Sequence, residues 1–192
     1  MNKKTNTRNM TYYGMIMAII IVMSLVPFLG YIQIPPLAIT LIHIPVIIGT
    51  ILFGWKAGLL FALTFGLSSM FVAMTRGATP LDLLFINPLV SVLPRVIFGA
   101  LIYPIYRFFE RVQSSEALSI GITAFVSTFI HSILVLTAMF LALGLKAGSF
   151  DGNVFMQVLA AVLTVVPLLE AVASTLISIP LVKAVRKSFK RN

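Results

Sequence analysis

The stretch AGLLFALTFGLSSMFVAM, residues 57–74, contains no charged residue and is long enough to cross a bilayer as a helix. The whole chain has the same character, since 59% of its 192 residues are hydrophobic, 10% are charged, and the mean hydropathy is +1.07. A soluble domain cannot bury so much apolar surface. The sequence therefore predicts an all-α integral membrane protein with no room for a separate soluble catalytic domain.

Further apolar runs lie on both sides of this stretch. Counted against about 20 residues per span, they predict a six-transmembrane-helix bundle that forms a single transmembrane domain over residues 1–192. The predicted spans are Met10–Phe28, Leu37–Phe53, Ala57–Met74, Leu83–Tyr106, Ala117–Leu143 and Val154–Val182. Only residues 54–56 separate the second span from the third, so these two should form a tight helical hairpin.

Lys and Arg residues indicate the orientation, because cytoplasmic flanks of membrane proteins are enriched in them. With six spans, eleven basic residues fall on one side. They are Lys3, Lys4, Arg8, Lys56, Arg107, Arg111, Lys183, Arg186, Lys187, Lys190 and Arg191. The opposite side receives Arg76 and Lys146. We therefore expect a multi-pass protein of the cell membrane, surrounded by lipid, with both termini cytoplasmic. The net charge of +9 follows from these flanks and does not indicate nucleic-acid binding.

The predicted outer loops are irregular. Gly30–Pro36 cannot form a regular helix because it ends in two prolines, and its alternating apolar residues suit a short extended flap. Thr75–Pro80 and Gly144–Asn153 are rich in glycine, proline and small polar residues. The three loops form either a lid over a ligand or ordinary connectors.

Arg95 is the only basic residue predicted inside a span. A cation in the membrane interior costs about 3 kcal/mol or more, so its side chain should face the interior of the bundle. Its partner is either Glu170, the only acidic residue deep in a span, or an anionic ligand, which we favour. Asn87 and Ser91 precede Arg95 by eight and four residues, and a continuous helix would place all three on one face.

His131 in the fifth predicted span should lie at the depth of Arg95, where it serves either a ligand or a helix–helix hydrogen bond. His43 lies nearer the outer end of its span, and we expect it to have a structural or rim role. Two histidines without metal-ligand spacing do not indicate a metal site. In the sixth span, Gln157 lies near the outer end. Deeper in that span, Glu170 is expected to contact Arg95, a ligand or a partner.

Motifs for catalysis and for phosphate binding are absent from the sequence. The chain has no cysteine, and the isolated His131 and Glu170 do not form a catalytic set. We therefore expect no catalytic residue and no directly bound cofactor, with a membrane-embedded enzyme as the less favoured alternative. Energy for uphill transport would have to come from another chain or from an ion gradient.

Three motifs resemble the substrate-binding S component of energy-coupling factor (ECF) vitamin transporters. They are ITLIHIPVIIG at residues 39–49, FGWKAG at residues 53–58 and LFINPLVSVLPR at residues 84–95. Their order and spacing, with the chain length and the basic tail, extend the resemblance over nearly the whole chain.

This resemblance implies a membrane-embedded, high-affinity vitamin-binding subunit of an ECF-type ABC importer. Such a subunit works with a transmembrane coupling subunit and with two cytoplasmic ATPases, which use the ATP. Gly14 and Ala18, four residues apart on one helical face, match the place where the first helix of the family contacts the coupling subunit. The ligand of the family lies near the outer face, beneath the loops that include Tyr31, and the S component is thought to topple in the membrane.

The vitamin suggested by the resemblance is pantothenate, because the His-Ile-Pro and Leu-Pro-Arg motifs look most like members assigned to it. Riboflavin, folate, or a pyridoxine or thiamine precursor is the alternative. The expected substrate-binding residues are Arg95, Asn87, Ser91, His131, Gln157, Glu170 and Tyr31. Many family members carry Asn-Gly ahead of the glutamate of span six, whereas this chain has Val166-Pro167-Leu168-Leu169, which leaves the role of Glu170 open.

Overall fold

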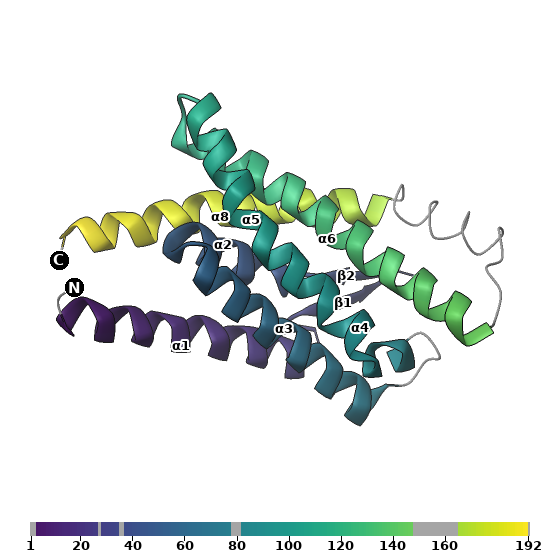
Figure 1. Ribbon diagram of the computed structural model, residues 1–192. Helices are drawn as coiled ribbons and strands as arrows, with labels where there is room; N and C mark the ends of the chain where they lie inside the picture. The colour runs from purple at the N-terminus through teal and green to yellow at the C-terminus, as the bar shows by residue number, and fades with distance from the viewer. Residues whose placement is uncertain (1–2, 27, 35–36, 78–81, 148–164, 192) are drawn as a thin grey trace.

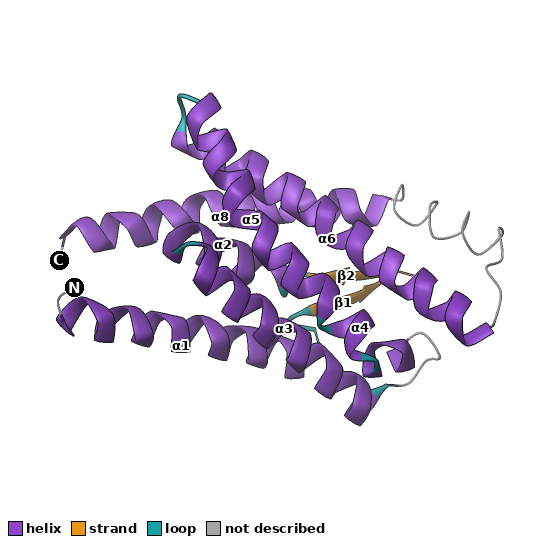
Figure 2. Ribbon diagram, in the orientation of Figure 1, coloured by secondary structure: helices purple, strands orange, loops and turns teal. Residues whose placement is uncertain are grey.

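The computed structural model describes residues 3–26, 28–34, 37–77, 82–147 and 165–191. In chain order, the elements are α1 (Lys3–Leu25), β1 (Tyr31–Ile34), β2 (Leu37–Thr40), α2 (His43–Phe53), α3 (Trp55–Arg76), the 3-10 helix η1 (Asp82–Ile86), α4 (Pro88–Ser91), α5 (Leu93–Val112), α6 (Glu116–Ala147) and α8 (Val165–Arg191). The described chain is thus a bundle of helices with one β-hairpin (Figures 1 and 2).

Within the described residues, four helical segments are long and apolar enough to cross a membrane. They are Trp55–Arg76, Pro88–Val112, Glu116–Leu145 and Val165–Phe189, and two shorter apolar helices cover Asn9–Leu25 and His43–Phe53. The prediction of a helical membrane protein is therefore confirmed, while the count of six spans stays a prediction. Both chain termini lie at the same end of the bundle (Figure 1). An even number of spans would produce this arrangement.

The segment between α1 and α2 forms an antiparallel hairpin in which Tyr31 pairs with Thr40 and Ile34 with Leu37. The extended flap predicted after Gly30 is therefore present. The prediction that the second span begins at Leu37 is wrong, because Leu37–Thr40 completes the ladder as β2 and the helix starts at His43. In the sequence, Pro35 and Pro36 directly follow β1, and because proline supplies no N–H for a helix, they favour an extended chain over a helix here.

The predicted tight connection between the second and third spans is confirmed. Helix α2 ends at Phe53 and α3 begins at Trp55, so Gly54 alone separates them. Gly54 has a φ angle of 88° and donates its N–H to the Thr50 carbonyl at 2.9 Å. A residue with a Cβ atom rarely adopts this backbone conformation, so glycine is what permits the turn.

The predicted fourth span is not one continuous helix, since it consists of η1, α4 and α5. The side chain of Asn87 caps α4 by accepting the Leu89 N–H at 3.0 Å, and Pro88 follows in the first turn. Proline suits that position because the first helical N–H groups have no partner within the helix. The helix expected to run through Asn87, Ser91 and Arg95 therefore starts at Pro88, directly after Asn87, and is interrupted at Val92.

Helices α3 and α5 pack closely because both have glycines at their contact. A Cβ atom added to Gly99 would collide with the Cβ of Ala62 and would lie 2.7 Å from the Gly58 carbonyl oxygen. Small residues permit such close approach of backbones in membranes. Phe65 of α3 and Phe98 of α5 are fully buried, and the rings of both contact His131.

Candidate ligand-binding site

Arg95, in the first turn of α5, is buried in the interior of the bundle and only 4% exposed. Its Nη1 donates to the Val90 carbonyl at 2.7 Å. Its Cζ lies 5.4 Å from the centre of the Phe65 ring and 4.9 Å from that of Phe85. Aromatic faces attract a guanidinium, and this attraction offsets part of the cost of removing the charge from water. The predicted inward orientation of Arg95 is therefore confirmed.

His131 of α6 lies beside Arg95, as the matched depths predicted. The His131 ring centre is 5.6 Å from that of Phe65 and 4.9 Å from that of Phe98. Phe65 thus contacts both Arg95 and His131. A cation and an imidazole, which are suitable partners for ligand oxygens, therefore meet across one aromatic ring.

His43 belongs to the same group, and of the structural and rim roles expected for it, its burial favours the structural one. Its side chain is fully buried and stacks on His131, with ring centres 5.5 Å apart and an interplanar angle of 23°. The cause is the late start of α2, which brings His43 into the first turn of a helix that packs within the core. The sequence contains a signal for this position, since His43 directly precedes an apolar helical run.

Glu170 of α8 is 6% exposed and has uncharged partners among the described residues. One carboxylate oxygen accepts the backbone N–H of Thr40 in β2 at 2.5 Å, and the carboxylate also accepts the hydroxyl of Ser132. The sequence allowed an ion pair between Glu170 and Arg95. In the structure Glu170 accepts these two hydrogen bonds instead. Because Ser132 follows His131 in α6, Glu170 borders the same helical turn as the histidine.

Residues from four helices therefore form one buried polar layer. We call it the polar layer and define it as His43, Arg95, His131, Ser132 and Glu170. Titratable groups are expensive to bury in a membrane protein and commonly mark a ligand pathway. Within the described residues, no three His, Asp or Glu side chains are close enough together to hold a metal ion. The layer is suited to a polar organic ligand.

The remaining predicted site residues are not members of the polar layer or fall outside the described ranges. Asn87 is exposed and caps α4, whereas Ser91 is buried and donates to the Gly66 carbonyl at 2.9 Å. Tyr31 lies in β1 opposite Thr40. Gln157 falls outside the described residues. Asn87 and Ser91 thus each have a structural role, Asn87 as the cap of α4 and Ser91 as a link between α4 and α3.

Gly14 and Ala18 are both exposed on the outer surface of α1. A Cβ atom added to Gly14 would meet no atom within 4 Å. The small-residue face predicted from the sequence is therefore open and is not used for packing within the described chain. Such a face permits close approach by a helix from another subunit.

Residues 8–182 match the protein family described as "ECF transporter, substrate-specific component". Over 157 residues the chain is also 32% identical to the pantothenic acid transporter PanT of Lactococcus lactis subsp. cremoris (strain MG1363). That alignment covers 74% of this chain and 77% of the relative. The family match runs from α1 into α8 and includes every residue of the polar layer.

Proposed function

The chain belongs to the family of ECF transporter substrate-specific components, and we propose that it is the subunit that binds pantothenate for uptake into the cell. Membership confirms the family resemblance of the three motifs and the preference for a transporter component over an enzyme. The choice of pantothenate is supported by the relative named as a pantothenic acid transporter. The observation that carries the proposal is a buried arginine beside two buried histidines.

Arg95 binds the carboxylate of the vitamin. Hydrogen bonds between a guanidinium and a carboxylate are charge-assisted, and their contribution increases where water is excluded. Arg95 meets this condition because it is almost fully buried and is held by Val90 and by two aromatic rings. Its fixed position favours a ligand that carries one carboxylate at one end.

The hydroxyl and amide groups of pantothenate meet the remaining residues of the polar layer. His131, next to Arg95, donates to or accepts from a ligand oxygen, and the Ser132–Glu170 pair accepts a ligand hydroxyl. Asn87, Ser91, Gln157 and Tyr31 complete the proposed set. The β-hairpin is fastened to this layer through Thr40, and it covers the ligand on the side opposite the chain termini.

The proposed protein spans the cell membrane six times with both termini in the cytoplasm. It works with a transmembrane coupling subunit, which contacts Gly14 and Ala18, and with two ATPases that use the ATP. The chain itself binds no cofactor. The shared end of the two termini and the open face of α1 support this arrangement.

Calorimetry on the purified protein in detergent tests the role of Arg95 directly. The ligands are pantothenate and its neutral analogue, in which a primary alcohol replaces the carboxylate. We expect the wild type to prefer pantothenate by at least about tenfold, since a hydrogen bond to a charged group contributes about 1.5–3 kcal/mol. Arg95→Gln should remove this preference, and Arg111→Gln, an exposed arginine in α5, is the matched control.

His131 variants separate hydrogen bonding from ring packing. His131→Gln keeps a donor and an acceptor and should retain more affinity for pantothenate than His131→Phe, which keeps only an aromatic ring. Equal affinity in both variants would exclude a polar role for His131. A panel of riboflavin, folate, thiamine and pyridoxine tests the substrate, because tighter binding of any of these would overturn pantothenate while leaving the family assignment intact.

A further inference from the structure

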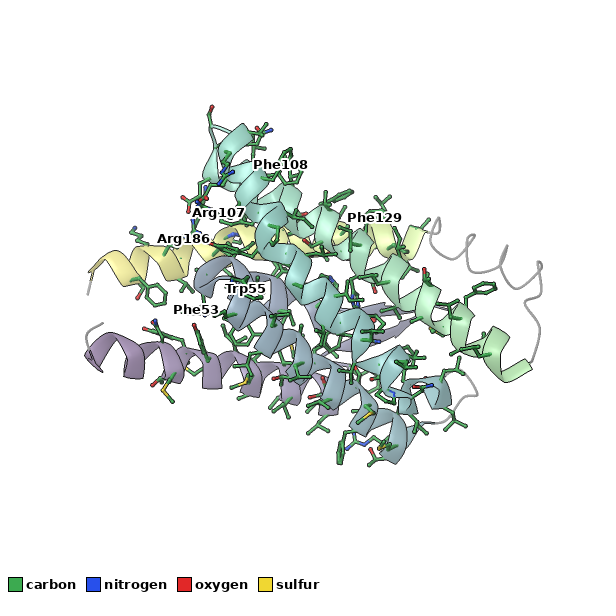
Figure 3. All side chains as sticks on the ribbon, viewed as in Figure 1. Phe53, Trp55, Arg107, Phe108, Phe129 and Arg186 are labelled. Atoms are coloured by element: carbon green, nitrogen blue, oxygen red, sulfur yellow. The ribbon has the colours of Figure 1, made fainter. Side chains whose placement is uncertain are left out.

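A second polar site lies at the end of the bundle that carries both chain termini, away from the polar layer. It is a cavity of about 750 Å³ between the ends of α5, α6 and α8. Its walls include Tyr106, Gln113, Ser114, Lys183 and Lys187. Figure 3 shows Arg186 of α8 and Arg107 of α5 toward this end of the molecule. Nothing in the proposed vitamin site requires this cavity.

The acidic side chains at the cavity already have basic partners. Glu110 accepts from Arg107 at 2.5 Å and from the hydroxyl of Tyr106 at 2.9 Å. Glu116 accepts from Arg186 at 2.6 Å. Arg186 also donates to the Tyr106 hydroxyl at 3.0 Å. These contacts join the side chains along one wall of the cavity, and each carboxylate is paired with an arginine.

Lys183 and Lys187 give the cavity positive charge that the acidic side chains do not neutralise. They lie one helical turn apart on α8, so both ammonium groups project from one face. Both side chains are exposed, and neither forms an ion pair with a described residue. Gln113 and Ser114 in the connection between α5 and α6 add hydrogen-bond donors. The cavity therefore favours an anion with several acceptor oxygens.

The surroundings of the cavity indicate where that anion comes from. Helix α5 ends at Val112 and α6 begins at Glu116, so the cavity lies at the ends of two helices that are long and apolar enough to cross a membrane, where lipid headgroups are expected. Phe108 and Val112 of α5 and Leu118 of α6 lie in the same helical turns as residues that line the cavity, and their large apolar side chains are 61%, 62% and 54% exposed. A ligand with a phosphate and two acyl chains can contact both the lysines and these side chains.

We propose that this cavity binds the headgroup of an anionic phospholipid from the leaflet on the side of the chain termini. The phosphate contacts Lys183 and Lys187, and the acyl chains lie against the exposed apolar side chains of α5 and α6. Basic pockets between transmembrane helices are suited to such headgroups, and each lysine near an anionic surface contributes to the attraction. Hydrogen bonds from Arg186 to Glu116 and to Tyr106 hold the wall of the cavity opposite the proposed phosphate contacts.

Native mass spectrometry of the full chain tests this proposal, with the protein in detergent and defined lipids added. The probes are phosphatidylglycerol and phosphatidylcholine with identical acyl chains. We expect the wild type to retain phosphatidylglycerol at least about tenfold better. The double variant Lys183→Gln/Lys187→Gln should lower that retention by about tenfold or more. The control Lys56→Gln/Arg111→Gln removes two exposed charges that do not line the cavity, and it should retain the lipid.

Further outcomes separate the lipid from other ligands. Equal retention of the two lipids by the wild type, or equal losses in the two double variants, would overturn the site. Displacement of phosphatidylglycerol by millimolar inorganic phosphate, together with binding of phosphate alone, would assign the cavity to a free anion and overturn the lipid. Both double variants should bind pantothenate with the affinity of the wild type. This measurement checks that each variant is folded.

Discussion

The carboxylate of Glu170 accepts the backbone N–H of Thr40 at 2.5 Å, and this bond joins α8 to the β-hairpin across 130 residues of sequence. The same carboxylate accepts the hydroxyl of Ser132 in α6. Glu170 therefore fastens the base of the hairpin to two helices at the polar layer. A substitution at Glu170 should therefore increase the local opening of the hairpin before it affects the rest of the bundle.

Glu170→Ala should free the hairpin without unfolding the bundle. The variant removes the acceptor of the Thr40 N–H, and hydrogen bonds to charged groups contribute about 1.5–3 kcal/mol. We expect amide hydrogen exchange in residues 31–40 to speed up by about tenfold or more, measured by mass spectrometry. Glu170→Gln keeps an acceptor oxygen and should give an intermediate rate.

Ser132→Ala is the matched control for this prediction, because it removes the second partner of Glu170 and leaves the Thr40 bond in place. Its exchange rate in the hairpin should stay near that of the wild type. Unchanged exchange in Glu170→Ala would show that the hairpin is held by other contacts.

Gly99→Ala should destabilise the bundle through overpacking. The added methyl group collides with Ala62 and with the backbone of α3 at Gly58, and crowding of this kind typically costs about 1–3 kcal/mol. Thermal unfolding in detergent should show a lower midpoint. Gly14→Ala adds the same methyl group in open space and should leave the midpoint unchanged. If Gly99→Ala and Gly14→Ala unfolded at the same temperature, the added methyl group at Gly99 would be accommodated without strain, and the predicted overpacking between α3 and α5 would be wrong.

Gly14→Leu and Ala18→Leu should stop transport while preserving vitamin binding. Both positions are exposed on α1, so the larger side chains disturb no described contact within the chain but block close approach by a coupling subunit. The measurements are uptake of labelled pantothenate by cells and co-purification of the ATPase complex.

Leu67→Phe, which enlarges an exposed side chain of α3, is the control for the α1 variants and should leave uptake intact. Normal co-purification of the ATPase complex with Gly14→Leu would place the partner on another face of the chain.

Several features were predictable because they depend on local sequence. Apolar runs of sufficient length predict membrane helices wherever they occur, and the run at 57–74 lies within α3. Gly54 indicates the turn between α2 and α3, and Pro35 and Pro36 separate the two strands of the hairpin in the sequence. The inward orientation of Arg95 follows from the cost of exposing a cation to lipid, so its burial was also predictable.

Tertiary structure alone decided which polar groups meet. Three contacts join residues far apart in the chain: His43 stacks on His131, Glu170 accepts the Thr40 N–H, and Arg186 pairs with Glu116 at the cavity between α5, α6 and α8. No local pattern encodes such pairs, because they depend on where α2 starts and on how the helices are placed against one another. Residue type and spacing thus determined the membrane fold class, whereas the packing of separate helices determined the site.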